Sequence, residues 1–291
     1  MNIGVKVENL SYSFKNQKIL DDINIDFYEN KIYGLLGKNG AGKTTLLNII
    51  TNQLLSKEGK IYIKGVEARK NPSILENICI VREKEYLNED AKVKDIFDIY
   101  FYFYKNYDKK LQHKLCKKFN IDIKKRYKNL SRGLKTLVFN IIGICSNADI
   151  VIFDEPTIGL DALNRAEFYD LLLDNYINNP KTIIIATHLI DEVENLLEEV
   201  VIINNKKVAV NDSIENLKEN SVYISGNKED LNKLEIIKNK KPIKTFRNNE
   251  TYAYYEKLSK EELNNIKELS LDIEVMSLND IFINISKEEI K

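Results

Sequence analysis

A glycine-rich stretch near the N-terminus constrains the fold of this 291-residue chain more than any other feature. It fits the pattern G-x-x-x-x-G-K-[ST] and stands between an expected strand, residues 31–36, and an expected helix, residues 42–51. Glycines let the backbone wrap closely around phosphates with its N–H groups pointing inward, and the start of the helix adds a partial positive charge. The stretch therefore predicts a phosphate-binding loop in an α/β fold. Its positions are Gly37, Lys38, Asn39, Gly40, Ala41, Gly42, Lys43 and Thr44.

The side chains at the end of this loop carry the chemistry of a nucleotide site. The Lys43 ammonium is expected to reach the β- and γ-phosphate oxygens of ATP, and Thr45 to add a phosphate contact. The Thr44 hydroxyl is expected to ligate Mg²⁺. A glycine-rich turn with an incidental lysine would not need eight positions in register between a strand and a helix, so the nucleotide interpretation is favoured.

Two adjacent acidic residues follow an apolar run in residues 150–156, which read Ile-Val-Ile-Phe-Asp-Glu-Pro. Such a run is typical of a buried parallel strand, and ligands bind at the carboxyl ends of strands in open α/β sheets. Asp154 is placed to hold Mg²⁺ through water as a second partner to Thr44. Glu155 is placed to polarise the water that attacks the γ-phosphate. Charged strand ends are common, so this motif gains its meaning from the phosphate loop upstream.

With these motifs in place, residues 5–212 resemble the ATP-binding cassette (ABC) ATPases. Residues 130–134, Leu-Ser-Arg-Gly-Leu, are similar to the signature sequence of that family, and residues 157–161, Thr-Ile-Gly-Leu-Asp, to its D-loop. His188 stands at the place of the switch histidine, and Phe14 at the place of an aromatic that stacks on adenine. The resemblance implies a P-loop core sheet with an antiparallel β lobe and a helical lobe that carries the signature.

The same resemblance implies a working unit of two cassettes, with each ATP between the phosphate loop of one and the signature of the other. Ser131 and the Gly133 backbone would then bind the γ-phosphate across the interface, and Asp161 would line it. A helix that starts near Ser131 supplies a physical reason, because its free N–H groups favour an anion. His188 would contact the γ-phosphate and orient the water that Glu155 activates.

Three positions depart from the family pattern. Arg132 and Leu134 replace the first glycine and the glutamine of the signature, and Glu83 stands where the family usually has a glutamine. Glu83 keeps an oxygen for the metal but adds a negative charge, which is expected to raise the Mg²⁺ requirement or to slow turnover. The Arg132-type signature and the C-terminal extension resemble those of ABC-2-type exporter subunits.

Composition bears on where such an ATPase would work. The chain has 44 basic and 44 acidic residues and thus no overall field for a polyanion, so we expect no nucleic-acid partner. No apolar stretch approaches the ~20 residues needed to span a bilayer, and the N-terminus lacks the pattern of a signal peptide. The resemblance then implies a cytoplasmic protein, peripheral on the cytoplasmic face of the plasma membrane. Its partners would be a separate transmembrane permease subunit and a second ATP-binding subunit.

The character of the sequence changes near residue 212, beyond which Lys, Asn and Glu are frequent. We expect an ABC-type cassette over residues 1–212 and a small α+β accessory domain over residues 213–291. The accessory domain carries no catalytic constellation, and its role is open between regulation and binding to its copy. Within the cassette, residues 93–125 and 189–198 are expected to be helical.

An aromatic stripe on the first of these helical segments has two interpretations. Phe97, Tyr100, Phe101 and Tyr104 fall at positions i, i+3, i+4 and i+7, so they share one helix face. The face belongs either to the core of the helical lobe, which we favour, or to a groove that receives a helix of the membrane partner. Partial exposure of the stripe is expected for the groove.

Two other functions remain open at the level of the sequence. One is a non-transport ABC protein that acts on ribosomes or DNA, which the single phosphate loop and the short distance from Lys43 to Ser131 disfavour. The other is a nucleotide-gated switch with negligible hydrolysis, which the altered signature and Glu83 allow.

Overall fold

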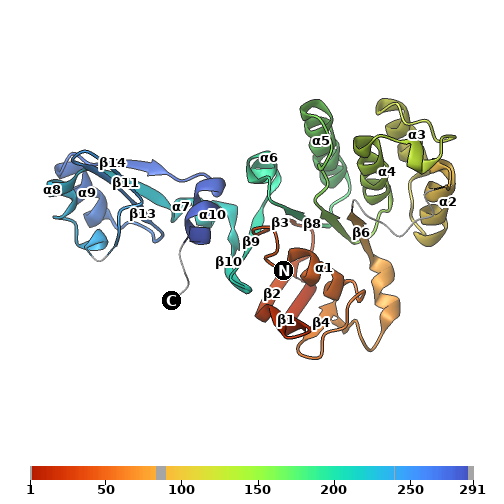
Figure 1. Ribbon diagram of the computed structural model, residues 1–291, viewed down its shortest axis with the longest axis horizontal. Helices are drawn as coiled ribbons and strands as arrows, with labels where there is room; N and C mark the ends of the chain where they lie inside the picture. The colour runs from red at the N-terminus through yellow and green to blue at the C-terminus, as the bar shows by residue number, and fades with distance from the viewer. Residues whose placement is uncertain (1, 83–89, 239, 288–291) are drawn as a thin grey trace. The chain divides into compact units, whose positions relative to one another are not determined.

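The computed structural model describes residues 2–82, 90–238 and 240–287 (Figure 1). The chain divides into two compact units, residues 1–211 and 212–291. Among the described residues, none of the helices combines the length and the apolar character that crossing a membrane requires.

The first unit is built on a six-stranded sheet of order β10-β9-β3-β8-β7-β6. The pairs β9–β3, β3–β8, β8–β7 and β7–β6 are parallel. Strands β3, β7 and β8 are buried along their whole length, as their nearly continuous apolar sequences predict. The strands are β3 (Ile32–Leu36), β6 (Ile78–Arg82), β7 (Ile150–Asp154), β8 (Thr182–Thr187), β9 (Glu199–Asn204) and β10 (Lys207–Ser213).

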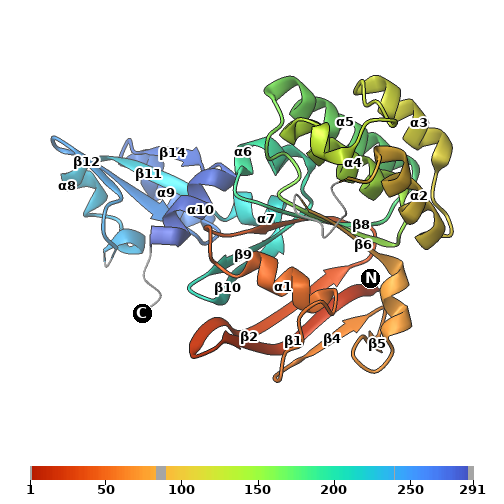
Figure 2. The same cartoon turned by 45° about the vertical axis from the view of Figure 1, so that its right-hand side comes forward.

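A second, antiparallel sheet of order β2-β1-β4-β5 forms the β lobe. Its strands are β1 (Ile3–Phe14), β2 (Gln17–Tyr28), β4 (Lys60–Ile63) and β5 (Val66–Glu67). Helix α1 (Lys43–Ile50) runs alongside this sheet (Figure 2). Its residues Leu46, Leu47 and Ile50 are fully buried in the same core as Val5 and Phe27 of the sheet. The helix that follows the phosphate loop is thus fixed by apolar packing.

The helical lobe contains α2 (Val93–Phe103), α3 (Lys109–Lys118) and α4 (Arg132–Cys145), which gather beside α5 (Ala162–Asn178) in Figure 1. The expected helical segment 93–125 is interrupted, because Tyr104 leaves the helical conformation and its hydroxyl donates to the Ile78 carbonyl at 3.1 Å. Short 3-10 helices are η1 (Pro72–Asn77) and η2 (Tyr127–Asn129).

The aromatic stripe of α2 faces mainly inward. Phe97 and Tyr104 are buried, while Tyr100 and Phe101 are half-buried, so this face packs largely into the helical lobe and keeps the partial exposure that is expected for a groove. The exposed apolar side chains of this segment are Ile99, Tyr102 and Phe103, which the sequence analysis did not single out.

The expected helix over residues 189–198 is wrong in its length. Helix α6 (Ile190–Val193) makes about one turn and continues as the 3-10 helix η3 (Glu194–Leu196). The chain then turns into the sheet, because the Glu198 N–H donates to the Ile32 carbonyl at 2.9 Å. Leu197 packs so closely over Gly34 that a Cβ there would lie 2.5 Å from its Cδ1 atom. Tertiary packing therefore ends this helix earlier in the chain than the pattern of acidic and apolar residues predicts.

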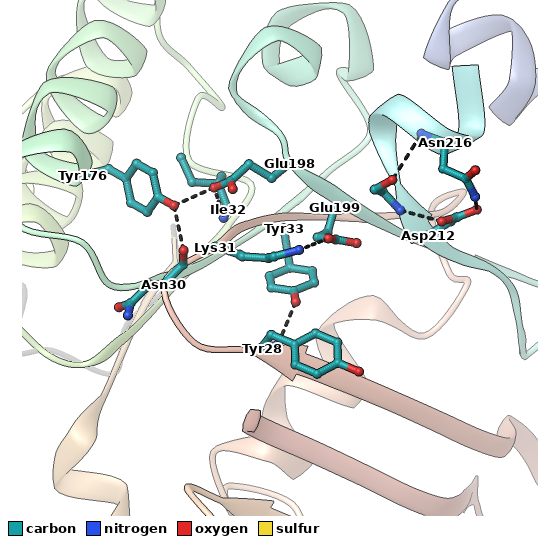
Figure 3. A network of polar contacts seen from close by, with 11 residues as sticks. Tyr28, Asn30, Lys31, Ile32, Tyr33, Tyr176, Glu198, Glu199, Asp212 and Asn216 are labelled. Atoms are coloured by element: carbon teal, nitrogen blue, oxygen red, sulfur yellow. Dashed lines mark hydrogen bonds and ion pairs between the residues drawn. The ribbon is translucent and has the colours of Figure 1, made fainter. Parts of the chain in front are cut away.

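A network of polar contacts fixes the start of β3, the strand that leads into the phosphate loop (Figure 3). The Tyr176 hydroxyl of α5 lies 2.8 Å from the Asn30 carbonyl and 2.6 Å from Glu198 Oε1. Glu198 Oε1 also accepts from the Ile32 N–H at 3.2 Å, and Lys31 forms an ion pair with Glu199. These contacts tie β3 to α5 and to the start of β9.

The second unit has an antiparallel sheet of order β12-β13-β11-β14 with its own apolar core, which includes Ile224, Leu231 and Ile266. Its strands are β11 (Val222–Asn227), β12 (Lys244–Phe246), β13 (Asn249–Tyr254) and β14 (Asp272–Val275). Its helices are α7 (Ile214–Glu219), α8 (Lys228–Leu231), η4 (Glu235–Ile237), α9 (Lys260–Glu268) and α10 (Leu278–Lys287).

Candidate nucleotide-binding site

The phosphate loop joins β3 to α1 in the conformation that its glycines predict. Gly40 and Gly42 have φ angles of 83° and 105°, a region that favours glycine. A Cβ at Gly42 would also lie 2.7 Å from the Leu20 side chain, so the β lobe leaves no room for a side chain at position 42. Gly42 precedes α1 without a side-chain cap, which leaves the first N–H groups of the helix available to an anion.

Lys43 lies inside this loop as a desolvated cation. Its side chain is only 6% exposed, and its Nζ atom donates to the Gly37 carbonyl at 2.6 Å. Burial lowers the pKa of the Lys43 ammonium, and the nearby charges of Glu155 and Asp154 oppose that shift. Among the described residues, the hydrogen-bond acceptor of Lys43 is this one neutral carbonyl of Gly37, so the ammonium has donors left for phosphate oxygens.

Thr44 and Asp154 lie together as the sequence predicts for a metal site. The Thr44 hydroxyl donates to Asp154 Oδ1 at 3.5 Å. Burial raises the pKa of the Asp154 carboxyl, while the charge of Arg82 and the Thr44 hydrogen bond counteract it. A hydroxyl and a carboxylate are oxygen ligands of the kind that Mg²⁺ takes, so these residues fit the ion. Glu83, the third predicted metal ligand, lies outside the described residues.

Glu155 and His188 are in direct contact although they are distant in sequence. The His188 Nδ1 atom lies 2.9 Å from Glu155 Oε1 and 3.0 Å from Oε2. Thr187 donates its hydroxyl to Glu155 Oε2 at 3.3 Å, a contact that the sequence analysis missed. Glu155 has a φ angle of 55°, a strained value for a residue other than glycine, and such strain tends to cluster at functional sites. The carboxylate is therefore held in one place beside Asp154.

The signature residues lie against the predicted D-loop of the same chain. Ser131 caps α4 by accepting from the Leu134 N–H at 3.3 Å, and Asp161 caps α5 by accepting from the Asn164 N–H at 2.8 Å. A Cβ at Gly133 would lie 2.7 Å from the Gly159 carbonyl oxygen, so only glycine permits this approach. Both capping residues are exposed, and their contacts with a nucleotide stay a prediction.

Phe14 ends β1 as an exposed ring. Its side chain is 62% exposed, and the Lys15 ammonium lies 5.9 Å from the ring centroid. An exposed aromatic face is suited to stacking on a base, which stays a prediction for this residue.

Comparisons with known proteins show the family to which the chain belongs. The family model described as "ABC transporter" matches residues 20–158. An uncharacterized ABC transporter ATP-binding protein of Methanocaldococcus jannaschii is 31% identical over 233 residues, which are 77% of this chain and 83% of the relative. The ABC transporter ATP-binding protein YtrB of Bacillus subtilis is 26% identical over 76% of this chain and 75% of its own length.

Solved structures show the same fold. An ATP-binding subunit of an ABC transporter superposes with a TM-score of 0.66 at 20% identity, covering 74% of this chain and 91% of that chain. CbiO1 of Clostridium perfringens, described as part of an ABC transporter complex, gives a TM-score of 0.60 at 28% identity over 74% of this chain and 90% of that chain. The fold, the paired motifs and these relatives together place the chain in the ABC transporter family, as one of its ATP-binding ATPase proteins.

Proposed function

We propose that this protein binds and hydrolyses Mg-ATP as one of two ATP-binding subunits and thereby powers export through a separate transmembrane subunit. It would work on the cytoplasmic face of the plasma membrane. The observation that carries the proposal is the junction of two distant motifs, because the Thr44 hydroxyl donates to Asp154 Oδ1 at 3.5 Å and Glu155 follows directly. Phosphate-binding and carboxylate groups thus share one edge of the sheet.

The residues divide the work of phosphoryl transfer among them. The loop N–H groups and the Lys43 ammonium would hold the β- and γ-phosphates. The N–H dipoles and the positive charge of the ammonium are both directed toward the interior of the loop, where the phosphates would lie. Bound Mg²⁺ would neutralise charge on the transferred group, with Thr44 and Asp154 as the residues that hold it. Little covalent chemistry falls to the protein, so positioning and charge stabilisation supply most of the rate.

Glu155 and His188 would position the attacking water. The imidazole contacts both carboxylate oxygens, which fixes the carboxylate against rotation. Glu155 would accept a hydrogen bond from the water and draw its proton away as the oxygen attacks the γ-phosphate. His188 would keep Glu155 in place and contact the γ-phosphate.

Three features support transport with a membrane partner, and the last of them favours export. Ile99, Tyr102 and Phe103 form an exposed apolar patch on α2, with exposures of 56%, 82% and 61%, which suits a helix of a transmembrane subunit. Among the relatives, the lantibiotic transport ATP-binding protein SrtF of Streptococcus pyogenes is 29% identical over 74% of this chain and 94% of its own length. The resemblance of the signature to ABC-2-type exporters points in the same direction.

Substitution of the proposed base tests the proposal directly. Glu155→Gln should leave ATP binding nearly intact, abolish turnover and trap an ATP-dependent dimer, because the amide keeps the shape of the carboxylate but cannot take a proton. Binding is measured with a fluorescent ATP analogue, turnover by phosphate release and dimerisation by size-exclusion chromatography with ATP. Thr187→Val is the control for local packing, since it removes one contact of Glu155 and keeps the carboxylate. Hydrolysis at the wild-type rate in Glu155→Gln would remove Glu155 from this role.

A further inference from the structure

An arginine stands beside the metal-binding carboxylate of the proposed site. Arg82 ends β6, and Asp154 ends β7 as its direct partner in the parallel register. Side chains at paired positions of adjacent strands point to the same face of a sheet. Arg82 and Asp154 therefore project together from neighbouring strand ends.

Helix α1 contacts both of these side chains. The Arg82 Nη1 atom donates to Asn48 Oδ1 at 2.6 Å, and the Thr44 hydroxyl donates to Asp154 Oδ1 at 3.5 Å. Residues four apart on a helix share one face, so Asn48 lies one turn beyond Thr44 on the side that faces the sheet. Arg82 thereby ties the helix of the phosphate loop to the strand that borders the carboxylate strand.

The rest of the guanidinium is shielded from solvent. The Arg82 Nε and Nη2 atoms are buried and have no hydrogen-bond partner within the part of the chain that the structure describes. An arginine keeps its charge at every physiological pH, and a charge screened by little water acts more strongly on its neighbours. The site thus holds a fixed positive charge on the carboxylate side in addition to Lys43 within the loop.

We propose that Arg82 is a positioning residue that sets the Mg²⁺ affinity of the nucleotide site, because its charge offsets the Asp154 carboxylate and repels the ion. The inference rests on the proposed function. The proposed role depends on the positive charge of Arg82. It therefore differs from a purely structural role, which would depend only on the hydrogen bond from Arg82 to Asn48.

Three variants separate charge from packing. Arg82→Gln removes the charge, Arg82→Lys keeps the charge but loses the guanidinium geometry, and Asn48→Ala removes the hydrogen bond while Arg82 keeps its charge. Binding of Mn²⁺, as a probe for Mg²⁺, is measured on the full chain with the non-hydrolysable analogue AMP-PNP, from the electron paramagnetic resonance signal of free Mn²⁺. Thermal unfolding without nucleotide shows that each variant is folded.

Arg82→Gln should bind Mn²⁺ more tightly than wild type by roughly five-fold, which is the change that about 1 kcal/mol of charge repulsion makes in an equilibrium. Arg82→Lys and Asn48→Ala should stay within about two-fold of wild type. Unchanged or weaker Mn²⁺ binding in Arg82→Gln would overturn the proposed role of Arg82, and so would equal changes of Mn²⁺ affinity in the Gln and Lys variants. Neither result would affect the proposed function. A wild-type protein that binds neither Mn²⁺ nor AMP-PNP would overturn the proposed function and this inference with it.

Discussion

The aromatic residues near the end of α2 should respond to substitution in opposite ways, according to the face on which they lie. Tyr104 is 8% exposed, stacks beside Tyr100 with ring centroids 6.4 Å apart, and donates its hydroxyl to the Ile78 carbonyl at 3.1 Å. Tyr102, two residues earlier, is 82% exposed. The two tyrosines form a matched pair, because the same side chain is removed from neighbouring positions.

The expected magnitudes follow from burial. Truncation of a buried aromatic to alanine costs about 3–5 kcal/mol of unfolding free energy through lost transfer energy and the cavity left behind. For Tyr104→Ala we expect about 3–4 kcal/mol, which lowers Tm by roughly 6–16 °C in a unit of this size. Tyr102→Ala removes a solvated ring, so its unfolding free energy should stay within about 0.5 kcal/mol of wild type.

Thermal unfolding of the nucleotide-free protein, followed by circular dichroism, checks both values. Docking to a membrane partner is measured by sedimentation with membrane vesicles from the source cell, where Tyr102→Ala should bind less than wild type at an unchanged Tm. If Tyr102→Ala unfolds as early as Tyr104→Ala, or if Tyr104→Ala melts like wild type, the assignment of the two faces is wrong. Vesicle binding that Tyr102→Ala leaves unchanged would instead refute the docking patch alone.

Other perturbations test separate parts of the molecule. Gly133→Ala places a Cβ 2.7 Å from the Gly159 carbonyl oxygen, so it should cost about 1–3 kcal/mol by thermal melting and prevent the ATP-dependent dimer. Lys43→Met should abolish binding of a fluorescent ATP analogue, yet keep or raise the apo Tm, because it removes a desolvated charge. The hydrogen bond from Tyr252 holds the pKa of Glu250 below its ordinary 4.5, so this carboxylate stabilises the fold above that pH and the contribution is lost on further acidification. In Glu250→Gln, Tm should fall less steeply with decreasing pH below 4.5 than in wild type. An unchanged fall of Tm would contradict this contribution of Glu250.

The phosphate loop was predictable because its requirements are local. Positive φ angles at Gly40 and Gly42 can be anticipated from the pattern itself, and the strand and helix around it follow from short apolar runs. The carboxylate strand was predictable for a similar reason, since a continuous apolar run that ends in two acids leaves few alternatives to a buried parallel strand. The sheet order then brings Thr44 to Asp154 without any further information.

The supporting contacts of the site could not be predicted from the sequence. Arg82 reaches Asn48 across 34 positions, and Thr187 reaches Glu155 across 32, and neither pair has a spacing that marks a motif. Such pairs depend on which strands become neighbours, and a polar residue at a strand end has many possible partners until that order is known. The short α6 has the same origin, because Leu197 is drawn into the sheet by a contact with Gly34.

The faces of α2 show where periodicity stops being informative. From Ile96 to Tyr104 every residue except one is apolar or aromatic, so stripes at helical spacing can be drawn on both sides of this segment. What decides between them is a set of distant contacts, such as the Phe139 ring of α4, 6.4 Å from Tyr100, and the Ile78 carbonyl that accepts from Tyr104. The core of the helical lobe needs apolar side chains on only one face of α2. The apolar side chains on the other face are therefore not explained by packing in that core. The remaining apolar face of α2 therefore suits the proposed membrane partner, and substitution of its exposed rings is the way to test that proposal.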